Sequence, residues 1–459
     1  MCGIFALLNS STQDYSVVNN EFMKCQKRGP EFSKLDNSNI EMMLGFHRLA
    51  INGLNEESNQ PLVIDNVTLI CNGEIYNYKE LYSMMGITPI TNSDCEVIIH
   101  LYIKYGIEQT LNMLDGVYAF VLYDNNIYNK DDEYHEPENR IYVARDPFGI
   151  RPLYYLKNIN DNYNLFKLFG FASELKCLEY FYNTNTFHYR IEQFTPGTYS
   201  TFKIKNSLWE LEKENVKYFI PTFSHSWPII NLTPNILEDK TFSLIAYYLT
   251  AAVNKRCLTT ERPIACLLSG GLDSSLIAAL VNNYYKLNNL PNKLETYSIG
   301  LKDSEDLKYA RIAACYLDTK HTEIVVTEQD MFDAIPEVIK NIESYDTTTV
   351  RASIGNYLLG KYISKHSDAK VIFNGDGSDE LFGGYLYMNK CPDDIEFDKE
   401  TRSLLRDIHL FDVQRSDKSI SSHGLEPRTP FLDKNFVNSS SLPLGSDLSP
   451  LSAILSCTG

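Results

Sequence analysis

The chain has 459 residues, 44% of them hydrophobic and 22% charged, which is the composition of a globular protein with about two to three domains. Its formal net charge of −17 at pH 7 disfavours a nucleic-acid partner, because no basic face is available for the phosphates. No segment approaches the ~18 apolar residues of a membrane span, and the apolar run at the start is too short for a signal peptide.

The 10 cysteines are scattered and include no CxxC pair. This distribution argues against a zinc site and against a disulfide framework. It favours a reducing compartment, so the sequence predicts a cytoplasmic protein.

A cysteine directly follows the first methionine. Removal of Met1 would leave Cys2 with both a thiol and a free α-amine, and that amine, with a pKa near ~7.7–8.0, can act as the base for its own side chain. The alternative is a cysteine placed there by chance, ahead of a first buried strand.

Residues 3–197 contain short runs of β-branched and aromatic residues bounded by turn residues. We expect strands at 67–71, 117–123 and 141–145, and helices at 79–85 and 95–104. This pattern predicts a sheet-dominated α+β domain. The polar stretch 124–140 separates two strands that would otherwise pair as a hairpin, and we interpret it as a solvated insertion.

The character of the chain changes after residue 240. Three prolines among polar residues, Pro221, Pro228 and Pro234, indicate a linker. Beyond it, we expect strands at 263–268, 295–299 and 371–373 and helices at 242–253, 274–285 and 306–316. Buried strands that alternate with helices predict an α/β domain with a doubly wound parallel sheet. The stretch 438–459 is rich in Ser, Leu and Pro and has no sustained period.

The strongest local signal is the loop Ser269-Gly270-Gly271-Leu272-Asp273-Ser274-Ser275, between a predicted strand and a predicted helix. Such a loop can direct backbone N–H groups and the positive end of the helix at a phosphate. It lacks the Gly-Lys-Ser/Thr ending of a Walker loop. Its form resembles the pyrophosphate loop of enzymes that split ATP into AMP and pyrophosphate, and the alternative is a chance turn.

A second loop, 374–385, follows another predicted buried strand and carries Asp376, Asp379 and Glu380. Closely spaced carboxylates repel one another unless a cation lies between them, and Mg²⁺ bound to phosphate oxygens is the natural candidate. The alternative is an acidic surface turn. A cluster further on contains Arg415, Lys418, Glu426 and Arg428; a lysine there could neutralise phosphate charge, or the cluster could be a solvated face.

Three short segments of the first half could form a pocket for a small zwitterion. Arg48 can clamp an α-carboxylate, and Asp94 can hold an α-ammonium group. Asn72-Gly73-Glu74 offers a side-chain amide and a backbone N–H as an oxyanion hole. Ordinary surface turns are the alternative for each, and spacing alone does not show that the segments converge.

Taken in order, these motifs resemble a known family. Met1-Cys2-Gly3-Ile4, Arg28-Gly29-Pro30, His47 to Ile51, Asn72 to Asn77, Ser93 to Glu96 and Ala144 to Gly149 resemble the class II (N-terminal nucleophile) glutamine amidotransferase domain. With the pyrophosphate loop, Gly377 to Tyr385 and Pro430-Phe431-Leu432-Asp433, the chain from Cys2 to about Asp433 resembles the glutamine-hydrolysing asparagine synthetases.

The resemblance implies a fold and a division of labour. It implies an Ntn-hydrolase-like domain of sheets sandwiched by helices at 2–203, an interdomain segment at 204–240, and an ATP-pyrophosphatase-type synthetase domain at 241–437. Cys2 would release ammonia from glutamine. The ammonia would pass through an internal channel and react with β-aspartyl-AMP, which forms from aspartate and ATP, to give asparagine, AMP and pyrophosphate.

It also implies the residues involved. Glutamine would be held by Arg48, Leu49, Ala50, Ile51, Asn52, Asn72, Gly73, Glu74 and Asp94, with Asn72 and Gly73 stabilising the oxyanion. ATP would contact Leu268, Ser269, Gly270, Gly271, Asp273, Ser274, Ser275, Ile299, Asn374 and Gly375, with Lys418 on phosphate. Asp273 and Asp379 would ligate Mg²⁺, and Asp376 would have a catalytic role. A homodimer is the oligomeric state that the resemblance suggests.

The sequence departs from the family pattern at three places. Asp376 stands where the family usually has a glutamate, one methylene longer. The insertion at 124–140 lengthens a hairpin that is usually short. The stretch 438–459 replaces a further helical region and looks like a truncation or a shifted reading frame. Two alternatives therefore stay open: a truncated protein that retains only glutaminase activity or acts as a non-catalytic partner, and a relative that adenylates another carboxylate, as β-lactam synthetases do.

Overall fold

The computed structural model describes residues 1–39, 41–125, 139–159, 167–184, 189–220 and 234–440. The chain divides into two compact units. Unit 1 comprises Met1–Phe219 together with Ser421–Leu425, and unit 2 comprises Ile220–Ile420 and the residues from Glu426 onward.

Unit 1 contains two six-stranded antiparallel sheets, with strand orders β10-β8-β9-β1-β3-β2 and β12-β11-β7-β6-β5-β4. Their strands are β1 (Gly3–Leu8), β2 (Phe32–Asn39), β3 (Met42–Arg48), β4 (Leu62–Ile64), β5 (Val67–Ile75), β6 (Gly116–Asp124), β7 (Arg140–Arg145), β8 (Tyr154–Asn158), β9 (Phe169–Ala172), β10 (Tyr189–Gln193), β11 (Thr198–Lys205) and β12 (Leu208–Lys217). The helices of the unit are α1 (Tyr15–Met23), α2 (Tyr78–Met85), α3 (Val97–Met113) and α4 (Glu179–Asn183).

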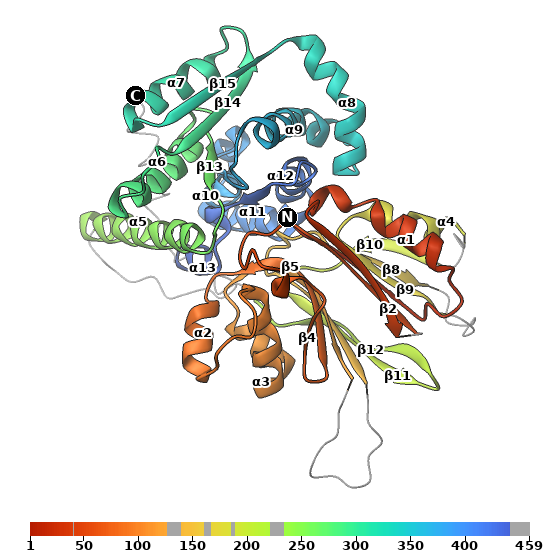
Figure 1. Ribbon diagram of the computed structural model, residues 1–459. Helices are drawn as coiled ribbons and strands as arrows, with labels where there is room; N and C mark the ends of the chain where they lie inside the picture. The colour runs from red at the N-terminus through yellow and green to blue at the C-terminus, as the bar shows by residue number, and fades with distance from the viewer. Residues whose placement is uncertain (40, 126–138, 160–166, 185–188, 221–233, 441–459) are drawn as a thin grey trace. The chain divides into compact units, whose positions relative to one another are not determined.

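The alternation of side chains along the strands produces four layers. In β1, Ile4, Ala6 and Leu8 join the core cluster shared by the two sheets, whereas Phe5 and Leu7 pack with residues of α1 and α4 on the outer face. In the second sheet, the outward-facing residues of β5 and β6 pack against α2 and α3. Figure 1 shows α1 and α4 on one side of this unit and α2 and α3 on the other. The strands are apolar on both faces because both faces are covered.

Unit 2 contains a five-stranded parallel sheet with the order β15-β14-β13-β16-β17. Its strands are β13 (Ile264–Leu267), β14 (Glu295–Leu301), β15 (Lys320–Val326), β16 (Val371–Phe373) and β17 (Glu426–Arg428). Its helices are α5 (Pro234–Leu258), α6 (Leu272–Leu287), α7 (Glu305–Leu317), α8 (Glu328–Ile342), α9 (Thr347–His366), α10 (Ser378–Phe382), α11 (Asp394–Asp407), α12 (Asp412–Ser421) and α13 (Lys434–Ser440).

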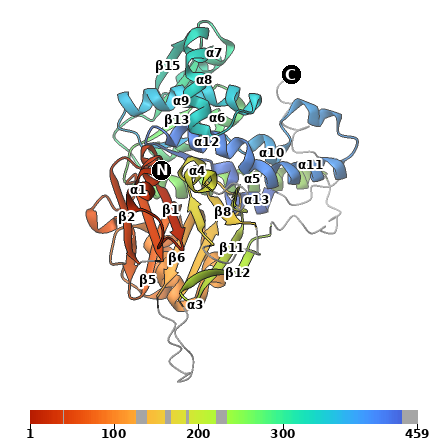
Figure 2. The same cartoon turned by 90° about the vertical axis from the view of Figure 1, so that its right-hand side faces the viewer.

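The strand order reverses direction between β13 and β16. From β13 the chain adds β14 and then β15 on one side, and it returns to place β16 and β17 on the other. The turns that follow β13 and β16 therefore lie next to each other at the carboxyl edge of the sheet, where open α/β sheets bind their ligands. Figure 2 shows α7, α8 and α9 gathered around β13 and β15, with α10 and α11 further along the unit.

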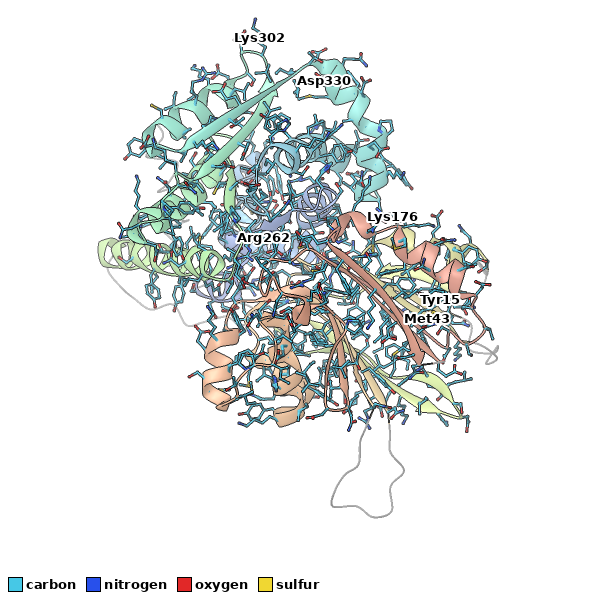
Figure 3. All side chains as sticks on the ribbon, viewed as in Figure 1. Tyr15, Met43, Lys176, Arg262, Lys302 and Asp330 are labelled. Atoms are coloured by element: carbon cyan, nitrogen blue, oxygen red, sulfur yellow. The ribbon has the colours of Figure 1, made fainter. Side chains whose placement is uncertain are left out.

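Two charged side chains of unit 2 point away from its core. Lys302, directly after β14, and Asp330, in the first turn of α8, project away from unit 2 in Figure 3. Asp330 also completes a capping box with Thr327, whose hydroxyl oxygen accepts the Asp330 N–H at 3.1 Å.

The structure confirms the predicted fold class, with an α+β unit of two sheets between helices and a doubly wound parallel α/β unit. The expected strands and helices are present, mostly extended by a few residues; the helix expected at 274–285 is α6. Within residues 204–240, predicted as a linker, the structure has β12 and the start of α5. The apolar signal of β12 is weak because Trp209 is its one fully buried large side chain. Most of the stretch 124–140 and nearly all of 438–459 lie outside the described residues.

Candidate active sites

Cys2 lies at the start of the central strand β1 in unit 1. Its side chain is partly buried against the core between the two sheets, and its thiol donates a hydrogen bond to the Leu49 carbonyl oxygen at an S···O distance of 3.6 Å. Met1 precedes it and is almost fully buried. The nucleophile predicted from the sequence therefore lies directly before β1, beside the segment predicted to bind glutamine.

Asn72 lies inside β5 and is fully buried. Neither the nitrogen nor the oxygen of its side-chain amide has a hydrogen-bond partner among the described residues. Leaving a buried amide unpaired costs about 1–3 kcal/mol, so an amide kept in this state is consistent with a group that waits for a ligand. β1 and β5 belong to different sheets but contact each other across the core.

The guanidinium of Arg48, at the end of β3, holds the loop that follows the strand. It donates hydrogen bonds to the Asn55 carbonyl (2.9 Å), the Asn59 side-chain oxygen (2.8 Å), and the carbonyls of Asn52 and Gly53. The structure thus places Arg48 in contact with loop oxygens at the position where the sequence predicts a carboxylate clamp.

Two further contacts bring the predicted glutamine-binding segments together. The Asn52 amide donates to a carboxylate oxygen of Glu74 at 2.6 Å. The Asp94 carboxylate accepts the backbone N–H of Ile75 at 2.7 Å, and Asp94 is 4% exposed. The backbone N–H of Ala50 is bound by the Glu31 carboxylate at 2.7 Å, a supporting residue that the sequence analysis does not single out.

Unit 2 contains a cavity of about 680 Å³ at the carboxyl edge of its sheet. It is bounded by the turns after β13, β14 and β16, by α9 and by the start of α12. Of the predicted nucleotide-binding residues, those on its walls are Leu268, Ser269, Gly271, Asp273, Ser274, Ile299, Asn374 and Gly375. Gly270 and Ser275 are not among the lining residues.

The serine-glycine loop is organised by its own hydroxyl groups. The hydroxyls of Ser269 and Ser274 are 2.8 Å apart, and the Ser274 hydroxyl also accepts the Ser269 N–H at 3.1 Å. Gly270 has φ +85°, and a Cβ at this position would clash with the backbone of Tyr309 and Ala310. Because Gly271 is the N-cap of α6, the loop presents the amino end of a 16-residue helix to the cavity.

Two carboxylates face the cavity from different loops. Asp273 is in the first turn of α6, and its Oδ1 accepts a hydrogen bond from the Ser378 hydroxyl at 2.7 Å. Burial raises the pKa of Asp379, and the negative charge of Asp273 raises it further. The charge of Asp273 thus disfavours the ionised form of Asp379, while burial is what raises the pKa of Asp273 itself.

This arrangement fits a magnesium ion. Among the described residues, no group of three or more His, Cys, Asp and Glu side chains is placed to hold a metal ion. Mg²⁺ at nucleotide sites, however, is usually held by one or two carboxylates together with substrate phosphates and water. Asp273 and Asp379 provide that carboxylate pair, so they are the residues that would hold it.

Asn374 and Asp376 form a small network at the end of β16. The Asn374 amide donates to Oδ2 of Asp376 at 2.7 Å and to the Ser416 hydroxyl at 2.6 Å. Burial raises the pKa of Asp376, against the positive charge of Arg415, which lowers it. Arg415 in turn forms an ion pair with Asp412.

Lys418, for which the resemblance implies a contact with phosphate, lies away from the walls of the cavity. Its side chain is fully buried, and its ammonium donates to the Glu343 carboxylate at 2.5 Å and to the Ile342 carbonyl at 3.3 Å. It is not among the lining residues of the cavity. Arg428, from the same predicted cationic cluster, is also fully buried and forms an ion pair with Glu426 at 2.8 Å. Helix and strand packing, which the sequence does not reveal, buries both cations.

Arg351 is a cavity residue that the sequence analysis does not single out. It lies in the first turns of α9, is exposed, and lines the cavity. The helix begins at an N-cap, Asp346, whose carboxylate accepts the Thr349 N–H at 2.8 Å. This cap and the three threonines after it are the signal in the sequence that places Arg351 near a helix start.

Comparison with known proteins matches a family model to each of the two parts of the chain. The glutamine amidotransferase domain model matches residues 1–213, and the asparagine synthase model matches residues 244–397 and 389–445. The chain is 39% identical over 451 residues to the glutamine-hydrolysing asparagine synthetase of Gallus gallus. It is 38% identical over 449 residues to those of Rattus norvegicus and Homo sapiens. Each alignment covers 95% of this chain and 76% of the relative.

A solved NAD⁺ synthetase from Burkholderia pseudomallei aligns with 50% of this chain and 89% of its own at 13% identity, with a TM-score of 0.22, a likeness too loose to add to the fold described above. No described helix is both long and apolar enough to cross a membrane. The family models and the identity to the curated relatives agree, and the chain belongs to the glutamine-hydrolysing asparagine synthetase family.

Proposed function

We propose that this chain makes asparagine from aspartate, using ATP and taking nitrogen from glutamine. The observation that carries the proposal is the cavity at the switch point between β13 and β16, where the serine-glycine loop and the carboxylates of Asp273 and Asp379 meet. We assign glutamine hydrolysis to residues 2–203 and the ATP-dependent reaction to residues 241–437, joined by residues 204–240.

In the glutaminase reaction, the thiolate of Cys2 attacks the amide carbon of glutamine after removal of Met1, with the new α-amine as its base. A thioester forms, ammonia leaves, and water then releases glutamate. The unpaired amide of Asn72 donates to the oxyanion, together with the backbone N–H of Gly73. This role would explain a buried amide that finds no partner among the residues that the structure describes.

The remaining residues of the glutaminase site bind the substrate. Asp94 holds the α-ammonium group, and Arg48 holds the α-carboxylate, for which its guanidinium must exchange part of its contacts with loop carbonyls. Leu49, Ala50, Ile51, Asn52 and Glu74 form the wall of the pocket. The hydrogen bond from Asn52 to Glu74 supports this assignment because it ties two parts of that wall together.

In the synthetase reaction, the side-chain carboxylate of aspartate attacks the α-phosphorus of ATP and pyrophosphate leaves. Ammonia then attacks the acyl carbon, AMP leaves, and a proton is lost to give asparagine. The loop 269–275 and the start of α6 bind the β- and γ-phosphates, while Leu268, Ile299, Asn374 and Gly375 contact the rest of the nucleotide.

Three side chains complete the synthetase site. Asp376 acts on the adenylate through a side chain that is one methylene shorter than the family's glutamate, so its carboxylate reaches less far. Arg351 offers an exposed cation to a carboxylate of aspartate. For Lys418, a phosphate contact requires its ammonium to leave Glu343 when the nucleotide binds. Mg²⁺ on Asp273 and Asp379 would neutralise phosphate charge as pyrophosphate departs.

The proposed setting is the cytoplasm, supported by the free thiol state of every described cysteine, and the proposed oligomer is a homodimer, which gel filtration with light scattering would test. Glutamine, aspartate and ATP are the proposed small-molecule partners.

The test is pyrophosphate release with ATP, Mg²⁺ and aspartate, with glutamine or ammonium as nitrogen donor. We expect asparagine from both donors with the native chain, and from ammonium alone with Cys2→Ala. Absence of aspartate-dependent pyrophosphate from both proteins would refute the synthetase function. Glutamate release in that case would favour a protein that is only a glutaminase, and pyrophosphate with a different carboxylate would favour a relative of the β-lactam synthetases.

A further inference from the structure

A five-residue segment near the end of the described chain, Ser421–Leu425, is part of unit 1. The residues directly before it, up to Ile420 in α12, and those directly after it, in β17, belong to unit 2. Ser421 and Leu425 are both fully buried. The cationic cluster flanks this segment, with Arg415 and Lys418 before it and Glu426 and Arg428 after it, and none of the roles described above uses the segment itself.

Arg28 connects this segment to the nucleophile. Its side chain is fully buried; its Nε–H donates to the Cys2 carbonyl oxygen at 3.0 Å, and Nη1–H donates to the Ser421 hydroxyl at 2.9 Å. The Glu174 carboxylate, 3.7 Å from Nη1, balances the charge of the guanidinium. The planar, rigid guanidinium thus fixes two groups at once, as a flexible lysine could not.

The segment reaches the start of the chain at two more points. While Met1 is present, its amino group donates to the Leu425 carbonyl at 3.3 Å; removal of Met1 ends this contact, so the link that remains to Cys2 is the one through Arg28. Gly424 has φ +66°, and a Cβ added there would lie 3.1 Å from Cγ of Pro30, two residues after Arg28. The bend at Gly424 therefore lets the segment pack closely against the Arg28-Gly29-Pro30 turn.

We propose that Arg28 and the Ser421–Leu425 segment are positioning residues for Cys2, so that the glutaminase nucleophile is held in place by a segment that follows α12 and precedes β17 in the sequence. Chain ends fray unless they are tied down, and misplacement of a nucleophile by about 1 Å can cost two orders of magnitude in rate. Arg28 provides the tie through the Cys2 carbonyl, and the Ser421 hydroxyl holds Arg28. The inference rests on the glutaminase function proposed for Cys2.

Ser421→Ala in the full-length chain tests this directly, because it removes one hydroxyl and little volume. We expect the kcat of glutamine hydrolysis to fall by about tenfold, with KM unchanged within about twofold, since the glutamine-binding side chains are not touched. Ser200→Ala is the matched control: it removes an equally buried hydroxyl that accepts the Asn215 N–H at 3.1 Å within unit 1. It should leave both constants unchanged.

Two further variants separate positioning from general stability. Ser421→Thr keeps the hydroxyl and should restore kcat to within about threefold of the native value. Arg28→Lys keeps the charge but loses the paired contacts, and it should lower kcat at least as much as Ser421→Ala. Thermal unfolding of each variant checks that the chain is folded, and ammonia-dependent asparagine formation should persist in Ser421→Ala.

Amide hydrogen exchange of the peptide that contains residues 2–8 gives a readout independent of turnover, and its first amides should exchange faster in Ser421→Ala than in Ser200→Ala. A native kcat and native exchange in Ser421→Ala would overturn the positioning role, and so would a kcat loss that Ser421→Thr does not restore. If the native chain has no glutaminase activity, the proposed function fails, and the exchange experiment then decides the positioning role alone. Exchange in Ser421→Ala equal to that in Ser200→Ala would reject the positioning role. Faster exchange in Ser421→Ala would support it.

Discussion

The hydroxyl of Ser378 donates a hydrogen bond to Oδ1 of Asp273 at 2.7 Å, and this contact joins two loops that are 105 residues apart in the sequence. It places Asp273 beside the loop that carries Asp379, within one cavity. Burial raises the pKa of Asp379, and the negative charge of Asp273 raises it further, so a negative charge on Asp379 is disfavoured in this cavity.

Asp379→Asn should therefore weaken the enzyme and stabilise the fold. Loss of one carboxylate lowers the rate of aspartate-dependent pyrophosphate release by about two orders of magnitude or more and raises the Mg²⁺ concentration needed for half-maximal rate. The melting temperature of the ligand-free protein should rise, because one of two mutually repelling charges is gone. Glutaminase activity is the internal control, and a melting temperature that falls would contradict the repulsion.

Asn72→Ala should separate activity from stability in unit 1. Removal of one oxyanion-hole donor typically costs about 10²–10³ in kcat, and we expect that loss in glutamine hydrolysis. The substitution also removes a buried amide that has no partner among the described residues. The energy gained by removing this unpaired amide offsets the cost of the cavity that alanine leaves, so the free energy of unfolding in urea should change by no more than about 1 kcal/mol. Ammonia-dependent synthesis should be unaffected. A large loss of stability would show that the amide has an important structural partner.

Lys418 and Glu343 form a buried ion pair, so single and double substitutions should differ. Lys418→Met leaves the Glu343 carboxylate without its ammonium partner and should destabilise the protein by about 3–5 kcal/mol. The double variant Lys418→Met with Glu343→Gln should recover most of that loss in urea unfolding. If Lys418 also contacts phosphate in the nucleotide complex, the double variant stays inactive in pyrophosphate release while its stability returns. Recovery of both properties would reduce Lys418 to a structural residue.

Asp433, the last residue of the motif Pro430-Phe431-Leu432-Asp433, lies outside the cavity and joins α5 to the start of α13. Its carboxylate is 2.6 Å from Arg256 and 2.5 Å from Lys255, and it accepts the Asn435 and Phe436 N–H groups at the start of α13. Burial alone would raise its pKa, but the charges of Arg256 and Lys255 prevail and lower the pKa below its ordinary value.

The stability that Asp433 contributes is therefore present above its ordinary pKa of 3.8 and is lost as the pH falls through the lowered value. Asp433→Asn should cost about 3–5 kcal/mol in urea unfolding at pH 7. The difference in unfolding free energy between the variant and the native protein should become progressively smaller below pH 4. A difference that does not depend on pH would show that the loss of stability comes from packing rather than from charge.

The sequence by itself determined most of the helices and strands and supplied the candidates for the reacting groups. The runs at 263–268 and 371–373 are apolar along their whole length, and the strands they predict lie side by side as β13 and β16. The loop 269–275 and Cys2 could be interpreted from the sequence because their chemistry depends on residues that are neighbours in the chain. The loop combines a glycine bend with the start of a helix, and Cys2 would carry an amine and a thiol on one residue.

Only the tertiary structure decided which polar side chains are engaged and by what. Lys418 and Arg428 have the same appearance in the sequence as a phosphate-binding cation, yet both are buried in ion pairs. Arg351 lines the cavity, the buried Asn72 amide has no hydrogen-bond partner in the part of the chain that the structure describes, and Arg28 links Cys2 to Ser421 across 393 positions of the chain. The physical reason is that burial and pairing of a charge depend on contacts between distant segments, whereas strand, turn and helix signals depend on residues close together in the chain.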